Sequence, residues 1–292
     1  MPSNEVLYVL RRITISSALF PGQTTACKIL SLRRDMRIHA DDAAKGWLLS
    51  ALCTVALAVF AVQCAPVLKG AFTCEGVQVL SDELTLPEAE AYCHYAVRER
   101  KKVEGFWGAT WSEPIRIHVS SSYRISRALV PGHLGNRGFM EMPLRGVREN
   151  TGALLHEIVH IYAPNNNRFL AEGLAVYLHT KLASNPAFPN FGEDLRRLAV
   201  RGLSGGGSLD ALNSVQTPRP LGTVMEEKTA YILAGSFVGF IIERYDLTLF
   251  RSLYETGNYE MVYGKPLGML EKEWRLGLRE SEQKPQLQTR SG

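Results

Sequence analysis

The sequence of 292 residues predicts an α+β domain behind an apolar N-terminal segment, and three observations lead to this class. Residues 47–68 form one apolar stretch without charge. Apolar and polar residues alternate along 115–119, which is the period of a half-buried strand, and 138–142 is a second candidate strand. From residue 153 onward, apolar residues recur at the spacing of helices. The sequence therefore predicts a small sheet followed by a mainly helical part.

The apolar stretch 47–68 holds about 22 residues, enough for a helix to cross the hydrocarbon core of a bilayer. The segment 1–46 is rich in lysine and arginine, so the positive-inside rule places it in the cytosol and the rest of the chain outside. We expect a transmembrane signal anchor, or, with a start at Met36, a secretory signal peptide. A buried core helix is the remaining alternative. The domain is thus expected to be extracytoplasmic, membrane-anchored or secreted, and periplasmic if the source is bacterial.

The net charge of +4 owes much to the basic segment 1–46, so it indicates membrane orientation and no nucleic-acid partner. Beyond the apolar stretch only Cys74 and Cys93 remain, and an oxidising compartment permits a disulfide between them. It would close a loop of about 20 residues and stabilise the fold by roughly 3 kcal/mol; two free thiols are the alternative. Thr85 and Glu88 have the spacing of a capping box and predict a helix over 85–102.

Residues 156–160 carry the sequence His-Glu-Ile-Val-His. Helical residues four apart lie on one face, so the imidazoles of His156 and His160 can bind one metal ion. Glu157 then lies beside the open coordination position, where its carboxylate can take a proton from water. The surrounding residues are apolar, which is typical of a buried helix, and buried polar groups need partners. Zinc would be that partner, and hydrogen bonds to backbone carbonyls are the alternative.

A second helix is predicted over 169–182, with Glu172 in its first turns. A catalytic zinc site takes three protein ligands and keeps the fourth position open, so a short turn after the first helix would present Glu172 as the third. A third histidine at the other common spacing is excluded, because Asn166 stands at that position. Gly173 lowers helix propensity and indicates the close approach of another backbone, as two tightly packed ligand helices would need. The alternative for Glu172 is an ordinary exposed glutamate.

Residues 156–160 and 168–177 together resemble the peptidase MA-like family of gluzincin zinc metallopeptidases, relatives of thermolysin and the aminopeptidases. The similarity continues in the helix patterns at 231–245 and 267–274, so it covers roughly 113–278. The resemblance implies a zincin-like domain with a mixed sheet, two ligand helices and a C-terminal helical subdomain. It also implies one zinc ion per chain and the hydrolysis of peptide bonds in a peptide or protein substrate.

In gluzincins an edge strand borders the cleft and pairs with the substrate backbone. The resemblance places Gly138, Phe139 and Met140 in that edge strand, as substrate-binding residues just before the metal helix. Glu141 beside them is expected to be an outward-facing strand residue.

The expected mechanism uses zinc held by the two histidines and Glu172, with Glu157 as the general base that passes a proton from water to the leaving amine. A further donor must stabilise the oxyanion. Tyr231, at the start of the later helix, is the candidate, and Tyr177 and His179 are its rivals.

The expected organisation is a cytosolic segment (1–46), the membrane segment (47–68), an N-terminal helical extension (69–112), the peptidase domain (113–278) and a flexible tail (279–292). Within the peptidase domain, a short amphipathic helix is expected at residues 191 to 200 and a long loop at 203 to 223. The alternative function is a membrane-anchored binding or assembly factor with the same fold and little turnover, and a purely structural zinc is a third. The sequence does not specify the substrate, the choice of endo- or exopeptidase action, or the oligomeric state.

Overall fold

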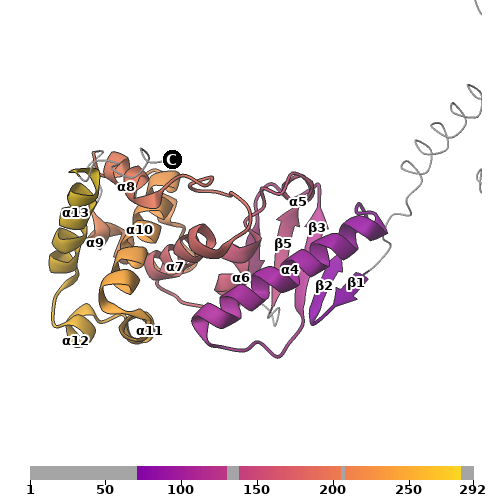
Figure 1. Ribbon diagram of the computed structural model, residues 1–292, viewed down its shortest axis with the longest axis horizontal. Helices are drawn as coiled ribbons and strands as arrows, with labels where there is room; N and C mark the ends of the chain where they lie inside the picture. The colour runs from indigo at the N-terminus through magenta and orange to yellow at the C-terminus, as the bar shows by residue number, and fades with distance from the viewer. Residues whose placement is uncertain (1–70, 130–137, 205–207, 284–292) are drawn as a thin grey trace, which may run out of the picture. The chain divides into compact units, whose positions relative to one another are not determined.

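The computed structural model describes residues 71–129, 138–204 and 208–283, in which a five-stranded mixed sheet is combined with helices (Figure 1). The α+β class and the helical C-terminal part are confirmed. The predicted segments 1–46 and 47–68 lie outside the described residues. Among the helices that are described, none has the length and apolar character needed to cross a bilayer.

The sheet has the strand order β1-β2-β3-β5-β4. Its strands are β1 (Ala71–Cys74), β2 (Val77–Leu80), β3 (Ile115–Ser120), β4 (Arg127–Leu129) and β5 (Phe139–Pro143). The inner pairs β2–β3 and β3–β5 are parallel, and the outer pairs β1–β2 and β4–β5 are antiparallel. Alternate residues of β2, β3 and β5 are buried, as the period of a half-buried strand requires.

The prediction that Gly138, Phe139 and Met140 lie in an edge strand is wrong. Met140 pairs with Ile117 on one side and with Ala128 on the other, so β5 is an inner strand. The side chain of Met140 is fully buried. The edge is formed instead by β4, a strand of three residues that is too short to show an alternating pattern.

Helix α4 (Leu86–Trp107) begins with the predicted capping box. The backbone N–H of Thr85 donates to the Glu88 carboxylate at 2.7 Å, and the Thr85 hydroxyl accepts from the backbone N–H of Glu88. The helix continues past the predicted end at residue 102 and stops at Gly108, which has a left-handed backbone conformation. Because α4 is the crossover between the parallel strands β2 and β3, the described part of the extension predicted at 69–112 belongs to the same sheet and core as the residues that follow it.

The disulfide between Cys74 in β1 and Cys93 in α4 is present. It joins the outer strand of the sheet to the helix that packs on β1 and β2. Cys93 is fully buried, so the bond lies in the core.

After the short helix α5 (Leu144–Arg148), α6 (Leu154–Tyr162) and α7 (Arg168–Leu182) form the centre of the domain. Every residue of α6 is buried, as its apolar sequence predicts. Its N-cap is Ala153, without a side-chain cap. The Asn167 side chain accepts a hydrogen bond from the backbone N–H of Leu170 and so caps α7. This cap fixes the residue at which α7 begins and therefore the direction in which each residue of α7 points.

Gly173 allows a close approach, but to α10 (Glu227–Tyr245) rather than to α6. A Cβ at this position would lie 2.7 Å from the backbone oxygen of Ala234 and 2.6 Å from Cγ2 of Val238. A Cβ on Gly235 of α10 would in turn meet a side chain of α7 at 2.4 Å. The expectation that the glycine serves the contact between α6 and α7 is therefore wrong, because the atoms nearest to it belong to α10.

Figure 1 shows α6 and α7 between the sheet and the C-terminal helices. Those helices are α8 (Leu195–Leu203), α9 (Leu209–Asn213), α10, α11 (Leu247–Thr256), α12 (Tyr259–Tyr263) and α13 (Leu267–Gln283). The helix expected from residue 191 thus begins at Leu195. The loop predicted over 203–223 contains α9 and a 3-10 turn, because Leu209, Leu212 and Leu221 are buried. The tail predicted from residue 279 is helical as far as Gln283.

Candidate metal centre

Helix α6 presents His156 and His160 from consecutive turns of one face. Their Nε2 atoms lie 3.1 Å apart, and their rings meet edge to face with centroids 4.8 Å apart. Both side chains are buried. The spacing of four residues therefore brings the two ring nitrogens to one point, as the sequence predicts.

Helix α7 brings Glu172 to the same point. Its Oε2 lies 3.0 Å from Nε2 of His156 and 3.3 Å from Nε2 of His160. Its other carboxylate oxygen, Oε1, forms an ion pair with Arg168, one turn earlier on the same helix. Burial alone would raise the pKa of Glu172, but the attraction of the two imidazoles and their hydrogen bonds outweigh it and hold that pKa well below its usual range. Glu172 is therefore ionised, with Oε1 paired to Arg168 and Oε2 directed at the two imidazoles.

The triangle of His156, His160 and Glu172 fits a metal ion better than it fits hydrogen bonds alone. A carboxylate oxygen only accepts, so both rings must carry a hydrogen on Nε2 to bond Glu172. Two Nε2–H groups would then face each other across 3.1 Å, where neither can accept. A cation inside the triangle satisfies all three atoms. At zinc–ligand distances of about 2.0–2.1 Å, tetrahedral ligand atoms are separated by about 3.3–3.4 Å, close to the observed separations.

The chemistry of these side chains also favours a transition metal such as zinc over magnesium or calcium. Two imidazole nitrogens with one carboxylate oxygen are typical of catalytic zinc sites, whereas magnesium and calcium prefer oxygen ligands only. These three buried residues are the group within the described part of the chain whose atoms are arranged to hold a metal ion.

Glu157 lies next to the triangle but outside it. Its Oε2 accepts a hydrogen bond of 2.7 Å from the backbone N–H of Ala128 in the edge strand β4. Burial raises the pKa of Glu157 to about 7, opposed by His156 and supported by the negative charge of Glu172. Its Oε2 is engaged by β4 rather than by the other three side chains.

Tyr231 lies beside His156, whereas its predicted rivals make other contacts. Its ring stacks on that of His156 with centroids 6.3 Å apart and an angle of 21° between the planes. The hydroxyl of Tyr177 accepts from Lys181 at 2.8 Å and contacts Glu243, in a separate polar group. His179 contacts a backbone carbonyl at 3.1 Å, and burial lowers its pKa to about 4. His179 is therefore a buried, neutral residue of the core.

Phe139 and Met140 belong to the inner strand β5 and Gly138 directly precedes it, so these residues do not form a sheet edge beside the candidate ligands. Phe139 packs near His118 instead, with ring centroids 6.4 Å apart. Glu141 pairs with Arg127 of β4 at 2.5 Å, on the surface side of the sheet.

Two contributors to the centre were not predicted from the sequence, namely Arg168 and the backbone of Ala128. Arg168 stands four residues before Glu172, a spacing that signals an ion pair within a helix. Ala128 contributes only its N–H, which no side-chain pattern can reveal.

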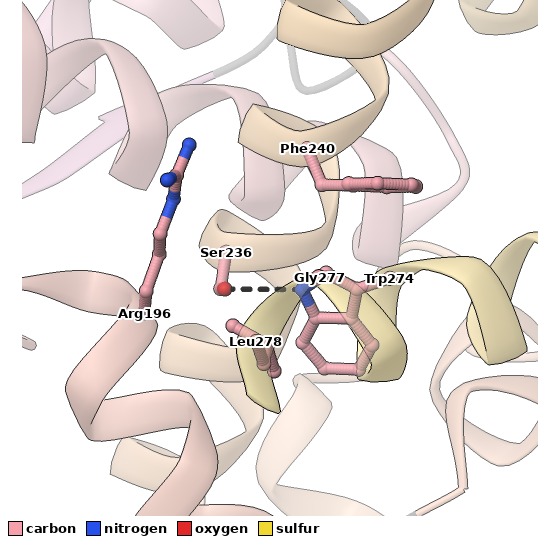
Figure 2. A pocket seen from close by; sticks show the side chains of 6 residues that line it. All are labelled: Arg196, Ser236, Phe240, Trp274, Gly277 and Leu278. Carbon is pink, nitrogen blue, oxygen red and sulfur yellow. Dashed lines mark hydrogen bonds between the residues drawn. The ribbon is translucent and has the colours of Figure 1, made fainter. Parts of the chain in front are cut away.

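A cavity of about 100 Å³ lies between α8, α10 and α13 and includes no residue of the metal centre. Figure 2 shows the side chains around it and the hydrogen bond of 3.2 Å that Trp274 donates to Ser236. The lining residues are Arg196, Ser236, Phe240, Trp274, Gly277 and Leu278. The cavity lies among the helices of the C-terminal part and contributes no residue to the candidate metal centre.

Comparison with known proteins finds partial similarity to solved structures only. No family model matches the sequence, and no curated protein is significantly similar to it. Three solved structures of an M1 zinc metallopeptidase from Deinococcus radiodurans are similar in part. A mutant is 17% identical with a TM-score of 0.41, covering 69% of this chain and 48% of its own. The unaltered protein is 19% identical with a TM-score of 0.38, covering 70% and 47%. The mutant bound to a Tyr-Ser-Ala substrate is 16% identical with a TM-score of 0.38, covering 74% and 48%. This chain thus spans about half the length of the proteins that it matches.

Proposed function

We propose that this chain is a zinc-dependent metallopeptidase that hydrolyses peptide bonds with Glu157 as the general base. The observation that carries the proposal is the arrangement of four buried side chains. Three of them converge on one point, while the fourth, Glu157, keeps a carboxylate beside that point. A purely structural zinc site would have no use for a carboxylate beside an open position.

When bound, zinc would supply Lewis-acid chemistry by acidifying water and polarising the scissile carbonyl. His156, His160 and Oε2 of Glu172 would hold it. Since Ala128 engages Oε2 of Glu157, Oε1 is the oxygen that takes the proton from the attacking water and passes it to the leaving amine.

Two further parts of the proposed site are Tyr231 and the strand β4. The Tyr231 ring stacks on that of His156, and this proximity supports Tyr231 as the donor to the oxyanion. Among the described strands, β4 pairs with β5 alone, and the Ala128 N–H on its other side is taken by Glu157, so an extended peptide would align beside β4 through the remaining backbone groups of that side. The substrate-binding role expected for residues 138 to 140 thus passes to β4.

The location outside the cytosol is part of the proposal. The apolar stretch 47–68 would anchor or export the chain, and the Cys74–Cys93 disulfide is typical of oxidising compartments. A reporter that is active only outside the cytosol, fused after the last residue, should be active in cells. Activity of a cytosol-only reporter at that place would contradict this location.

The proposal is tested by hydrolysis of a peptide mixture before and after metal removal. The full chain should cleave peptides, lose this activity to a chelator and regain it with about one zinc ion per chain. Magnesium should not restore it, because the ligand set contains two imidazoles. Hydrolysis that is unaffected by complete zinc removal would contradict the proposal.

A further inference from the structure

Two phenylalanines are exposed in the segment that joins α7 to α8. Phe188 is 38% exposed and Phe191 is 55% exposed. Single exposed apolar side chains are common, but these two contact each other edge to face, with ring centroids 6.3 Å apart. A pair of large aromatic rings that stays in water forms an apolar surface suited to a binding partner.

This pair continues the row of rings that begins at the metal centre. Phe188 packs edge to face on Tyr231 with centroids 5.5 Å apart, and Tyr231 stacks on the metal-ligand candidate His156. We call Tyr231, Phe188 and Phe191 the aromatic shelf. It therefore runs from a proposed zinc ligand to the solvent without a gap.

The outer end of the shelf is held in an unusual backbone conformation. Phe191 has a φ of +48°, in the left-handed region that bulky residues rarely adopt. Its N–H donates to the backbone oxygen of Ala187 at 2.8 Å, and the buried side chain of Asn190 donates to the backbone oxygen of Glu193 at 2.7 Å. These bonds impose the strained conformation, which keeps the Phe191 ring at the surface.

We propose that the aromatic shelf binds a large apolar side chain, preferably aromatic, of the peptide residue that flanks the hydrolysed bond. This inference rests on the proposed peptidase function. An extended peptide advances about 3.3–3.6 Å per residue, so a residue next to the scissile bond can place its ring on Phe188 or Tyr231. Ring pairs are favourable at centroid distances of about 4.5–7 Å, the range found within the shelf itself.

A positive charge at the outer end of the shelf affects which substrate side chains bind there. The Lys228 ammonium lies 5.8 Å from the centroid of the Phe191 ring. Because Lys228 already lies over the Phe191 ring, a lysine or arginine side chain of the substrate would have to displace it there, whereas an uncharged ring would not. The shelf is thus selective for uncharged rings over cations.

The test compares cleavage and binding in the full, zinc-loaded chain. Cleavage sites in a peptide library are mapped by mass spectrometry for the wild type and for Phe188→Ala/Phe191→Ala. Peptides that differ only by Phe or Ala beside the cleaved bond are then bound to Glu157→Gln, with and without the two shelf substitutions. The single variant Phe191→Ala is included in case the double variant misfolds, because Phe191 is the more exposed of the two phenylalanines. Met261→Ala is the matched control, since Met261 is 63% exposed on α12.

We expect the wild type to favour aromatic residues beside the cleaved bond, and Glu157→Gln to bind the Phe peptide at least about tenfold more tightly than the Ala peptide. Both preferences should fall below about threefold in the double variant, fall partly in Phe191→Ala, and persist in Met261→Ala. Cleavage or binding with the same aromatic preference in the double variant would overturn the shelf and leave the peptidase function standing. A zinc-loaded chain that neither binds nor cleaves any peptide would overturn both.

Discussion

The backbone N–H of Ala128 donates a hydrogen bond of 2.7 Å to Oε2 of Glu157, so the edge strand β4 is joined directly to the proposed general base. In the proposed site, the strand beside the substrate would therefore also orient the Glu157 carboxylate. A peptide aligned on β4 would be aligned with Glu157 by the same backbone.

Replacing Ala128 by proline tests this connection, because proline removes the N–H without removing a side chain of the centre. Proline is tolerated on edge strands where the N–H does not serve the sheet. We expect kcat to fall about 10-fold to 100-fold, as a hydrogen bond to a charged group is lost. Zinc content, measured by atomic absorption, should stay near one per chain. Ala128→Gly is the control, and unchanged kcat in the proline variant would contradict the connection.

The role of Glu172 as a ligand is tested by zinc affinity. Two imidazoles alone form a weak site, so Glu172→Ala should weaken zinc binding by more than about 100-fold in a competition with a chelator. Glu243→Ala is the control, because Glu243 pairs with Arg196 at the surface. If Glu172→Ala retained the zinc affinity of the wild type, Glu172 would not be a ligand.

Arg168 should act through Glu172. It pairs with Oε1, so Oε2 is left on the side of the two imidazoles, where it would bind the metal. Arg168→Gln should lower zinc affinity about 10-fold to 100-fold, as loss of a partner to a metal ligand typically does. Arg196→Gln, which breaks an exposed ion pair, should not change it. Equal zinc affinity in both variants would show that Arg168 does not position the ligand.

Packing between α7 and α10 supports the position of Glu172. Gly173→Ala places a Cβ 2.7 Å from the backbone oxygen of Ala234, so the helices must separate. We expect unfolding by urea to show a loss of about 1–3 kcal/mol. Gly105→Ala in α4 is the matched control, because its Cβ would meet nothing within 4 Å. That substitution should leave the free energy of unfolding unchanged or raise it by up to about 1 kcal/mol. The reverse order of stability would contradict the close packing of α7 and α10.

The convergence of the three candidate ligands was predictable because it depends on local geometry. The positions of His156 and His160 follow from helical periodicity, and Glu172 follows from a short turn and a second helix. The capping box at Thr85 and the burial of α6 are likewise properties of neighbouring residues. The α+β class follows from the same local patterns.

The edge strand and the partner of Gly173 were not predictable, since both depend on which distant segments meet. Three residues of β4 carry no period, and their place beside β5 is set by the tertiary fold. Gly173 signals a close approach, but a sequence does not state which helix approaches. The contribution of Ala128 is a backbone group and leaves no residue pattern.

Hydrolysis by Glu157→Gln is the most direct test of the peptidase mechanism. Glutamine keeps the size of the side chain and an oxygen that accepts from Ala128, but it cannot act as a base. With zinc content and thermal unfolding near those of the wild type, the rate of peptide hydrolysis should fall about 10²-fold to 10⁴-fold. Glu243→Gln, at an exposed glutamate of α10, should keep the wild-type rate. A zinc-loaded Glu157→Gln chain that hydrolyses peptides at the wild-type rate would contradict the mechanism.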